Sequence, residues 1–259
     1  MQKVYRLSAN TSDYTKVGKH MKYMTKEWYN TMSNGPLPPQ TITKKAEIFS
    51  ETYYKEIYKI EEAKWIELQE SVSKVINKRS FFEEKAAKRE FRKIHQTIIK
   101  TVKESLTDNI LSKIADIRVF ALGYASKEVE EEFIKRGNYV KNTMEDYDRQ
   151  FKKTFGDNPP KFTEKFVLHD SDVISCRKKG KDIEIKIEGV YTDITGFKLK
   201  NCTVLKQDGR LYGAQFLYEE IYKSGDRLEL HFLLRKWSSK TQKLLDFIVT
   251  VDDVELIRN

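Results

Sequence analysis

The sequence is poor in the features that would identify a secreted, membrane or disulfide-stabilised protein. It has two cysteines in 259 residues, Cys176 and Cys202, and no CxxC spacing. Isolated thiols in a chain this long are typical of a reducing compartment. No apolar run approaches the length of a membrane span, and the first residues show no apolar core of a secretory signal. We therefore expect a cytoplasmic protein with no membrane association.

The motifs of common enzymes are also missing. The chain contains no G-x-S-x-G, no G-x-G-x-x-G, no Walker loop and no H-E-x-x-H. These patterns place nucleophiles, phosphate-binding amides and zinc ligands. Their absence favours a binding protein over an enzyme, and the sequence predicts neither a cofactor nor a metal.

What is present divides the chain into two halves with different periods. Up to residue 155 apolar residues recur at helical spacing, and from residue 162 they alternate in runs such as "DIEIKIE" and "RLELHFLL". Between them lies "GDNPP", a strong helix stop. We predict an α+β protein with a basic helical domain over 1–155, a linker over 156–161, and an antiparallel β-rich domain of five to seven strands over 162–259.

Within the helical half the pattern predicts several separate helices. One spans 42–75, another begins at a capping box formed by Ser80 and Glu83, and others cover 107–123, 126–137 and 140–155. Near the amino terminus a helical stripe runs straight through Met21. Met21 is also an alternative start, which would make residues 1–20 an extension.

The net charge of +9 is concentrated in one segment. From Lys74 to Lys103 there are ten basic and three acidic residues. On the helix that follows Ser80 the basic side chains lie opposite the apolar ones, and they form a candidate binding surface: Lys85, Arg89, Arg92, Lys93, Lys100 and Lys103. This surface would suit nucleic acid or an acidic protein. The plainer interpretation is a solvated face balanced by Glu83, Glu84 and Glu90.

A second candidate is an acidic and histidine cluster in the hairpin "LYEEIYKSGDRLELHFLL" over 217–234. The expected turn pairs Tyr222 with Arg227, Glu220 with Glu229, and Tyr218 with His231. Such a cluster of Tyr218, Glu220, Glu229 and His231 could share a proton as a general acid or hold a divalent metal. A solvated outer face is the interpretation that the sequence favours.

The remaining histidines are weaker candidates for a functional site. The stretch "FVLHDSDVIS" places His169, Asp170 and Asp172 at the entrance to the β domain, and a His-Asp pair is typical of metal-dependent phosphohydrolases. We favour a polar turn in which Asp170 or Ser171 caps backbone amides. His95 is expected at the edge of the helical core.

Several stretches of the chain resemble a family of bacterial proteins of unknown function. They are "MKYMTKEWY" (21–29), "ILSKIADIRVFALGYASKEV" (110–129), "LHDSDVIS" (168–175), "LYGAQFLYEEIY" (211–222) and "LELHFLL" (228–234). The resemblance implies a bacterial protein and carries no activity. The strand entry "LHDSDVIS" before a small β domain is also similar to parts of bacterial immunity proteins, which act by binding.

Taken together, these features favour a non-enzymatic bacterial binding protein, immunity-like or inhibitory in role, whose partner is another protein. Nucleic-acid binding through the helix over 80–103 is the first alternative, and a hydrolase with an acidic and histidine site in the β domain is the second. The oligomeric state stays open.

Overall fold

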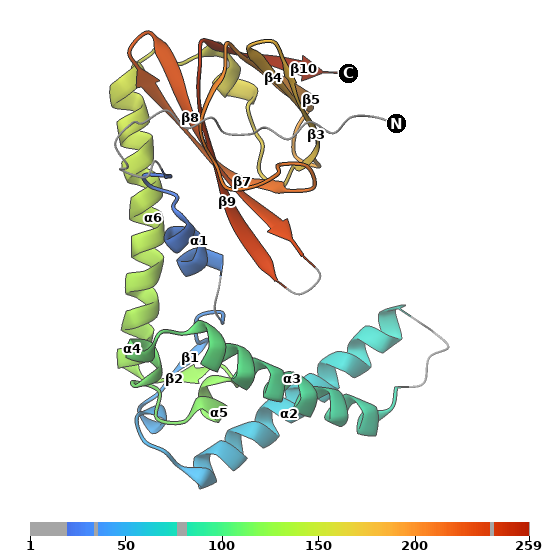
Figure 1. Cartoon of the computed structure of the whole chain (residues 1–259). Helices are drawn as coiled ribbons and strands as arrows, with labels where there is room; N and C mark the ends of the chain where they lie inside the picture. Colours follow the sequence, from blue (N-terminus) through green and yellow to red (C-terminus); the bar gives the residue numbers. More distant parts are fainter. Residues whose placement is uncertain (1–19, 34–35, 77–81, 239–240, 259) are drawn as a thin grey trace. The chain divides into compact units, whose positions relative to one another are not determined.

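The computed structural model describes residues 20–33, 36–76, 82–238 and 241–258. The described chain forms two compact units (Figure 1). One is the helical unit, Lys26–Arg149. The other is the β unit, which combines residues 20–25 with Gln150 onward. The amino-terminal segment therefore belongs with the β unit and not with the helices that follow it in sequence.

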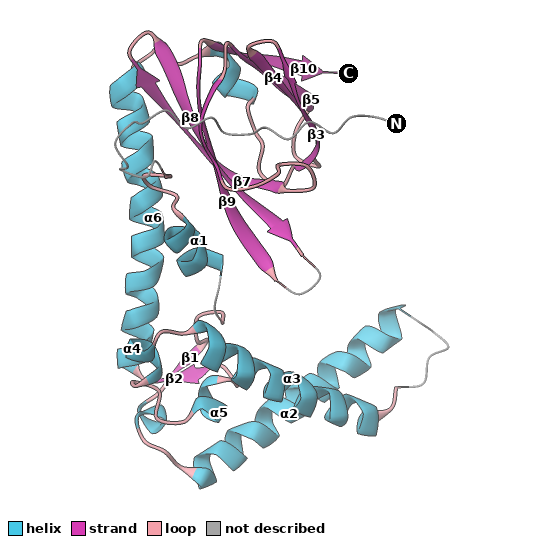
Figure 2. Ribbon diagram, viewed as in Figure 1, coloured by secondary structure: helices cyan, strands magenta, loops and turns pink. Residues whose placement is uncertain are grey.

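Among its described residues the helical unit has five helices of its own, α6, which it shares with the β unit, and a two-stranded parallel ladder (Figure 2). In order, its elements are α1 (Lys26–Ser33), β1 (Thr41–Ile42), the 3₁₀ turn η1 (Lys44–Glu47), α2 (Glu51–Ile76), α3 (Glu84–Ser105), α4 (Asp108–Leu111), α5 (Ile117–Phe120), β2 (Tyr124–Ala125) and α6 (Lys127–Phe155). The division between the units falls within the last turns of α6.

The helix boundaries correct several predictions. The first long helix begins at Glu51, because residues 41–42 pair with β2 and the Thr43 side chain caps η1. The segment 107–123 forms two short helices, α4 and α5, and not one. The two helices expected over 126–155 are one helix, α6, which passes through Gly137 without a break. It ends before Gly156 at φ 56°, as the "GDNPP" stop predicts.

The methionine stripe near the amino terminus is not one helix. Met21 and Met24 precede α1 in an irregular segment, and both side chains are buried. Val17, the first residue of the predicted stripe, and Ser80, the first residue of the predicted capping box, lie outside the described residues.

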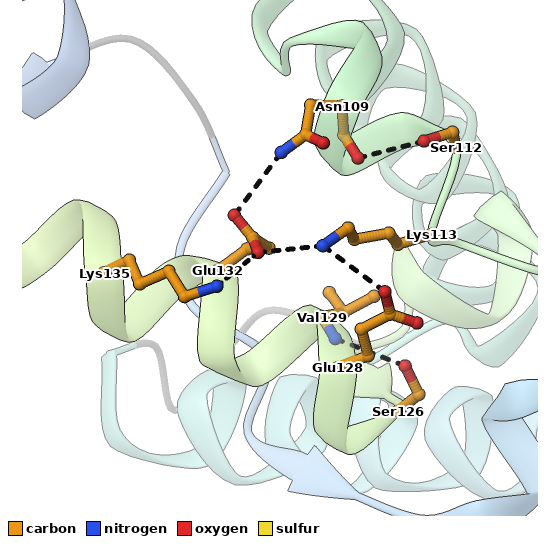
Figure 3. A network of polar contacts seen from close by, with 8 residues as sticks. All are labelled: Asn109, Ser112, Lys113, Ser126, Glu128, Val129, Glu132 and Lys135. Carbon is orange, nitrogen blue, oxygen red and sulfur yellow. Dashed lines mark hydrogen bonds and ion pairs between the residues drawn. The ribbon is translucent and has the colours of Figure 1, made fainter.

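The helical core includes a cluster that joins the end of α3, the short helices and the start of α6. Its buried members are Val102, Leu106, Ile110, Phe120, Ala125, Val129 and Phe133. A polar network borders it (Figure 3). Lys113 Nζ donates to Glu132 Oε1 at 2.9 Å and lies 3.3 Å from Glu128 Oε1, while Lys135 reaches Glu132 at 2.8 Å. These two lysines lower the pKa of Glu132 to about 2, so its carboxylate stays charged and, through Lys113, ties the turn after α4 to α6.

The β unit is built on one eight-stranded antiparallel sheet, so the expected five to seven strands were too few. The strand order is β10-β5-β4-β3-β7-β8-β9-β6. The strands are β3 (Asp172–Lys179), β4 (Asp182–Glu188), β5 (Ile194–Lys200), β6 (Thr203–Gln207), β7 (Gln215–Ser224), β8 (Arg227–Trp237), β9 (Gln242–Val251) and β10 (Asp253–Arg258). A 3₁₀ turn, η2 (Lys161–Lys165), leads into the sheet.

Aromatic side chains fill the core that this sheet encloses. Phe166, just after η2, packs edge-on against Phe197 of β5 and Phe232 of β8, with ring centroids 5.1 and 6.2 Å apart. Gly196 permits the close pairing of β4 and β5, because a Cβ there would lie 2.5 Å from the Ile185 carbonyl oxygen. The alternating pattern of the sequence therefore corresponds to one apolar face packed around Phe166.

Candidate functional site

Helix α3 is held in place by an apolar and aromatic face. Ala87, Phe91, His95 and Val102 are its buried residues. Phe91 packs edge-on against Tyr58 of α2, with ring centroids 5.2 Å apart, and also lies beside Trp65. This packing fixes which side of α3 faces solvent.

His95 is part of this packed face. Its Nε2 lies 3.0 Å from the Arg118 carbonyl oxygen, which can only accept, so Nε2 carries the proton. Its ring stacks on Tyr54 at a centroid distance of 6.0 Å. Burial lowers the pKa of His95 and keeps the ring neutral. The expected place at the edge of the core is confirmed, with the ring buried.

The basic face of α3 is exposed as the sequence predicts. All six predicted residues are on the solvent side: Lys85, Arg89, Arg92, Lys93, Lys100 and Lys103. Two have weak acidic contacts, because Arg89 lies 3.6 Å from Glu83 and Lys100 lies 3.8 Å from Glu104.

The other four have no acidic partner within 4 Å among the described residues: Lys85, Arg92, Lys93 and Lys103. Glu84, expected to balance this face, instead pairs with Lys88 at 2.6 Å. The acidic residues of α3 thus leave most of the predicted surface uncompensated.

The hairpin cluster assembles in a different register from the predicted one. Ser224 pairs with Arg227 around a two-residue turn that contains Gly225 at φ 63°. Tyr222 therefore faces Glu229, and Glu220 faces His231. The predicted opposition of Glu220 and Glu229 was wrong by two residues, which keeps them on the same face of the sheet.

Tyr218 is displaced from the cluster. It pairs with Leu233, next to a bulge between Phe216 and Tyr218, and its ring lies 5.2 Å from His169. The predicted contact between Tyr218 and His231 is not made.

The solvated outer face predicted for this hairpin was also wrong. Glu220 and His231 are 0% and 1% exposed. The Glu220 carboxylate accepts backbone N–H bonds from Lys22, Tyr23 and Met24 at 2.8, 2.9 and 2.6 Å, and a hydroxyl bond from Tyr222 at 2.6 Å. Four donors therefore satisfy the hydrogen-bonding capacity of this buried carboxylate.

His231 connects the two glutamates. Its Nε2 lies 2.7 Å from Glu229 Oε1, and its Nδ1 lies 3.9 Å from Glu220 Oε2 without a hydrogen-bond partner. Burial lowers the pKa of His231, and its bond to Glu229 partly offsets this. A neutral ring that donates from Nε2 satisfies this geometry.

This arrangement fits a structural role better than either chemical role. The oxygens of Glu220 are taken up by four donors, and Glu229 is bound to His231 and not to Glu220. Within the part of the chain that the structure describes, no three His, Cys, Asp or Glu side chains are grouped to hold a metal ion. The cluster anchors residues 22–24 to the sheet.

The "LHDSDVIS" stretch forms the junction between β3 and β7. Asp170 adopts φ 60°, its amide donates to the Phe216 carbonyl, and the Phe216 amide donates to Ser171. A polar turn is confirmed, but its side chains differ from the expected caps. The Asp170 carboxylate lies 3.3 Å from the Arg235 guanidinium and 3.5 Å from His169 Nε2.

His169 and Asp172 do not form a three-residue site with Asp170. His169 Nδ1 donates to the Leu217 carbonyl, which fixes the tautomer and leaves Nε2 beside Asp170. Asp172 is exposed at the first position of β3, where it pairs with Glu188 of β4 and Gln215 of β7.

Glu219 is an unusual acidic residue that the sequence patterns did not single out as a candidate. Glu219 lies on the apolar face of β7 and pairs with Phe232. Although part of its side chain remains exposed, its apolar surroundings raise the pKa of Glu219 to about 8. The signal was an acidic residue at an inward position of an alternating strand.

Comparison with known proteins adds no relative, since no family model, curated protein or solved structure matches the chain. The resemblance to a bacterial family therefore stays a prediction. None of the helices in the described residues combines the length and apolar character needed to cross a bilayer.

Proposed function

We propose that this chain is a non-catalytic binding protein that uses the basic face of α3 to hold an acidic protein partner. The observation that carries the proposal is the set of four exposed cations without an acidic neighbour among the described residues: Lys85, Arg92, Lys93 and Lys103. Exposed cations on a rigid helix raise the rate of encounter with an acidic surface and orient it. The face needs neither cofactor nor metal for this role.

The composition of the face favours a protein over nucleic acid. The helix has a single aromatic side chain besides its histidine, Phe91, and both Phe91 and His95 are buried. Within the described helix, residues 84–105, the surface therefore lacks the exposed rings on which unpaired bases stack. Phosphate contacts alone remain the basis of the nucleic-acid alternative.

The resemblance noted in the sequence supports a bacterial protein with an immunity-like or inhibitory role. Cytoplasmic residence fits Cys176 and Cys202, which are unpaired and partly buried. Burial raises the pKa of these thiols to about 11 and 12, so they remain protonated and weakly reactive at neutral pH.

The test uses the full chain and two probes, a fluorescent poly-glutamate peptide and labelled single- and double-stranded nucleic acid. Anisotropy is followed at about 50 and 200 mM salt, because charge contacts weaken as salt rises. The variant reverses three charges, Arg89→Glu, Arg92→Glu and Lys93→Glu. We expect the peptide to bind, and the variant to lose at least tenfold in affinity.

A matched control reverses the same number of charges on the β unit, with Lys178→Glu, Lys181→Glu and Lys243→Glu. These lysines are exposed, so both variants should fold. Equal losses in the two variants would show an effect of net charge alone and contradict the proposal. Tighter binding of nucleic acid than peptide, lost only on α3, would establish the alternative.

A further inference from the structure

The hairpin of β8 and β9 extends beyond β7 at one end of the β unit (Figure 1). Strand β7 begins at Gln215, opposite Arg235, whereas β8 and β9 stay paired as far as Trp237 and Gln242. The Trp237 side chain is 65% exposed, and the Arg235 guanidinium lies over its ring at 5.8 Å from the centroid. An indole this exposed is unusual, because tryptophan is highly buried on average.

The loop that precedes β7, residues 208–214, lies beside this end of the hairpin. Lys236 Nζ donates to the carbonyl oxygens of Arg210 and Tyr212 at 3.1 and 2.6 Å, so the lysine holds the loop against β8. The Tyr212 side chain is 68% exposed. Two exposed aromatic residues, Tyr212 and Trp237, are thus brought to the same end of the sheet from distant parts of the sequence.

Three cations lie at this end, and none has a carboxylate within 4 Å among the described residues: Arg210, Lys236 and Lys243. Lys243 faces Lys236 across the ladder of β8 and β9. Two acidic side chains of the adjoining segments, Asp208 and Asp246, are instead held by Lys206 at 3.8 and 2.7 Å. The positive charge of the three cations is therefore not neutralised within the described chain.

We infer that this ring surface, formed by Arg210, Tyr212, Lys236, Trp237 and Lys243, binds single-stranded nucleic acid. Exposed rings stack on unpaired bases of any sequence, and the neighbouring cations contact the phosphates. A duplex keeps its bases stacked on one another, so it would meet the cations alone. This ligand is additional to the acidic partner of α3, and its site lies on the other unit.

The combination of rings and cations favours nucleic acid over other anionic ligands. An acidic peptide would use the cations and leave both rings in water. A membrane surface would need an apolar area to insert, whereas the residues next to the rings are small or polar: Gly213, Ser238 and Gln242. Helix α3 shows the opposite case, since within residues 84–105 its solvent face has cations and no exposed ring.

Fluorescence anisotropy with the full chain tests the inference. The probes are labelled oligothymidylate of about 20 nucleotides and a duplex of equal length. We expect the single strand to bind more tightly than the duplex, and its affinity to fall as salt rises from about 50 to 200 mM. Tyr212→Ala with Trp237→Ala should lower the affinity for the single strand at least about tenfold, because both stacking platforms are lost. Trp237→Phe keeps an aromatic ring and should retain most of the affinity.

A matched control removes two exposed side chains elsewhere on the β unit, with Val190→Ala and Tyr191→Ala, which are 89% and 70% exposed in the wild type. It should bind the single strand as the wild type does. Circular dichroism would verify that both double variants keep the fold, as expected for changes at exposed positions.

Three outcomes would overturn the inference. They are no binding of the single strand at about 50 mM salt, unchanged binding by the ring variant, and equal losses in the ring variant and its control. Vesicles of anionic phospholipid serve as a further probe. Binding of vesicles in place of the oligonucleotide, lost in the ring variant, would also overturn it and assign the surface to a membrane.

The two proposals fail separately. The ring variant changes no charge and leaves Arg89, Arg92 and Lys93 in place, so it should bind the poly-glutamate peptide as the wild type does. Loss of the single strand with retained peptide binding would support both proposals. Loss of the single strand in the α3 variant, with retention in the ring variant, would place the nucleic-acid site on α3 and overturn this inference.

Discussion

At the scale of single residues, the chain shows how burial changes the behaviour of similar acidic groups. Glu219 and Glu220 are neighbours on β7 and point to opposite faces of the sheet. Glu220 meets four donors, whereas Glu219 faces Phe232. Hydrogen bonds hold the Glu220 carboxylate in place, whereas apolar surroundings disfavour the charged form of Glu219.

Glu219 makes stability depend on pH. Its pKa is raised to about 8 in the fold, so the folded state holds a proton that the unfolded chain releases near pH 4.5. Its contribution to stability is therefore fully present below about pH 4.5 and is lost as pH rises through 8. Glu219→Gln should leave stability unchanged near pH 5 and increase it by about 1 to 3 kcal/mol at pH 9.

Urea unfolding of both proteins at pH 5, 7 and 9 would check this. Glu184→Gln serves as the opposite control, because its ion pair with Lys179 lowers the pKa of Glu184. That variant should gain no stability at pH 9. A Glu219→Gln curve parallel to wild type at every pH would contradict the expected burial.

At the scale of elements, packing overrides local signals in both directions. Gly137 lowers the local stability of helix α6. The helix nevertheless continues through it, because buried residues such as Val129 and Phe133 hold the helix by packing. The segment 107–123 has a helical pattern, yet it breaks where Asp116 caps α5 by accepting from the Arg118 amide.

Gly137 offers a direct measure of that local cost. A Cβ at this position would meet nothing within 4 Å. Gly137→Ala should therefore stabilise the chain by about 0.5 to 1 kcal/mol, by restricting the unfolded backbone. Thermal and urea unfolding of the variant and the wild type would measure this gain in unfolding free energy.

The comparison is Gly189→Ala, where the added Cβ would lie 2.2 Å from Ser171 Oγ. That variant should be destabilised. A destabilised Gly137→Ala would show that α6 is not a regular helix at this point.

At the scale of the whole molecule, one buried carboxylate brings together parts of the chain that are almost 200 residues apart. Glu220 of β7 binds the amides of Lys22, Tyr23 and Met24. This contact explains why residues 20–25 belong to the β unit although the helical unit follows them directly.

Glu220→Gln should release this segment. An amide offers one acceptor oxygen in place of two and turns an N–H group toward donors, which leaves buried groups unsatisfied. We expect a loss of about 2 to 4 kcal/mol in unfolding free energy. Hydrogen exchange should also lose its protection at the amides of residues 22–24.

Tyr222→Phe is the milder control, since it removes one of the four donors and should cost about 1 kcal/mol. Unchanged protection at residues 22–24 in Glu220→Gln would show that other contacts hold the segment.

The sequence by itself determined the α+β class, the change from helices to strands at "GDNPP", and the exposed basic face of α3. These follow from periodicity and charge, which act between residues close in the chain. It also placed Glu220, Glu229 and His231 on one face of a strand pair, because a register error of two residues preserves the alternation.

Only the tertiary structure decided whether that face is wet or buried. The donors to Glu220 come from residues 22–24, and no local pattern relates them to β7. The same holds for the apolar face that periodicity predicts for α2, because its members Leu68, Val72 and Val75 remain exposed near the end of the helix. Burial depends on what the rest of the chain places over a face, and this is set by contacts distant in sequence.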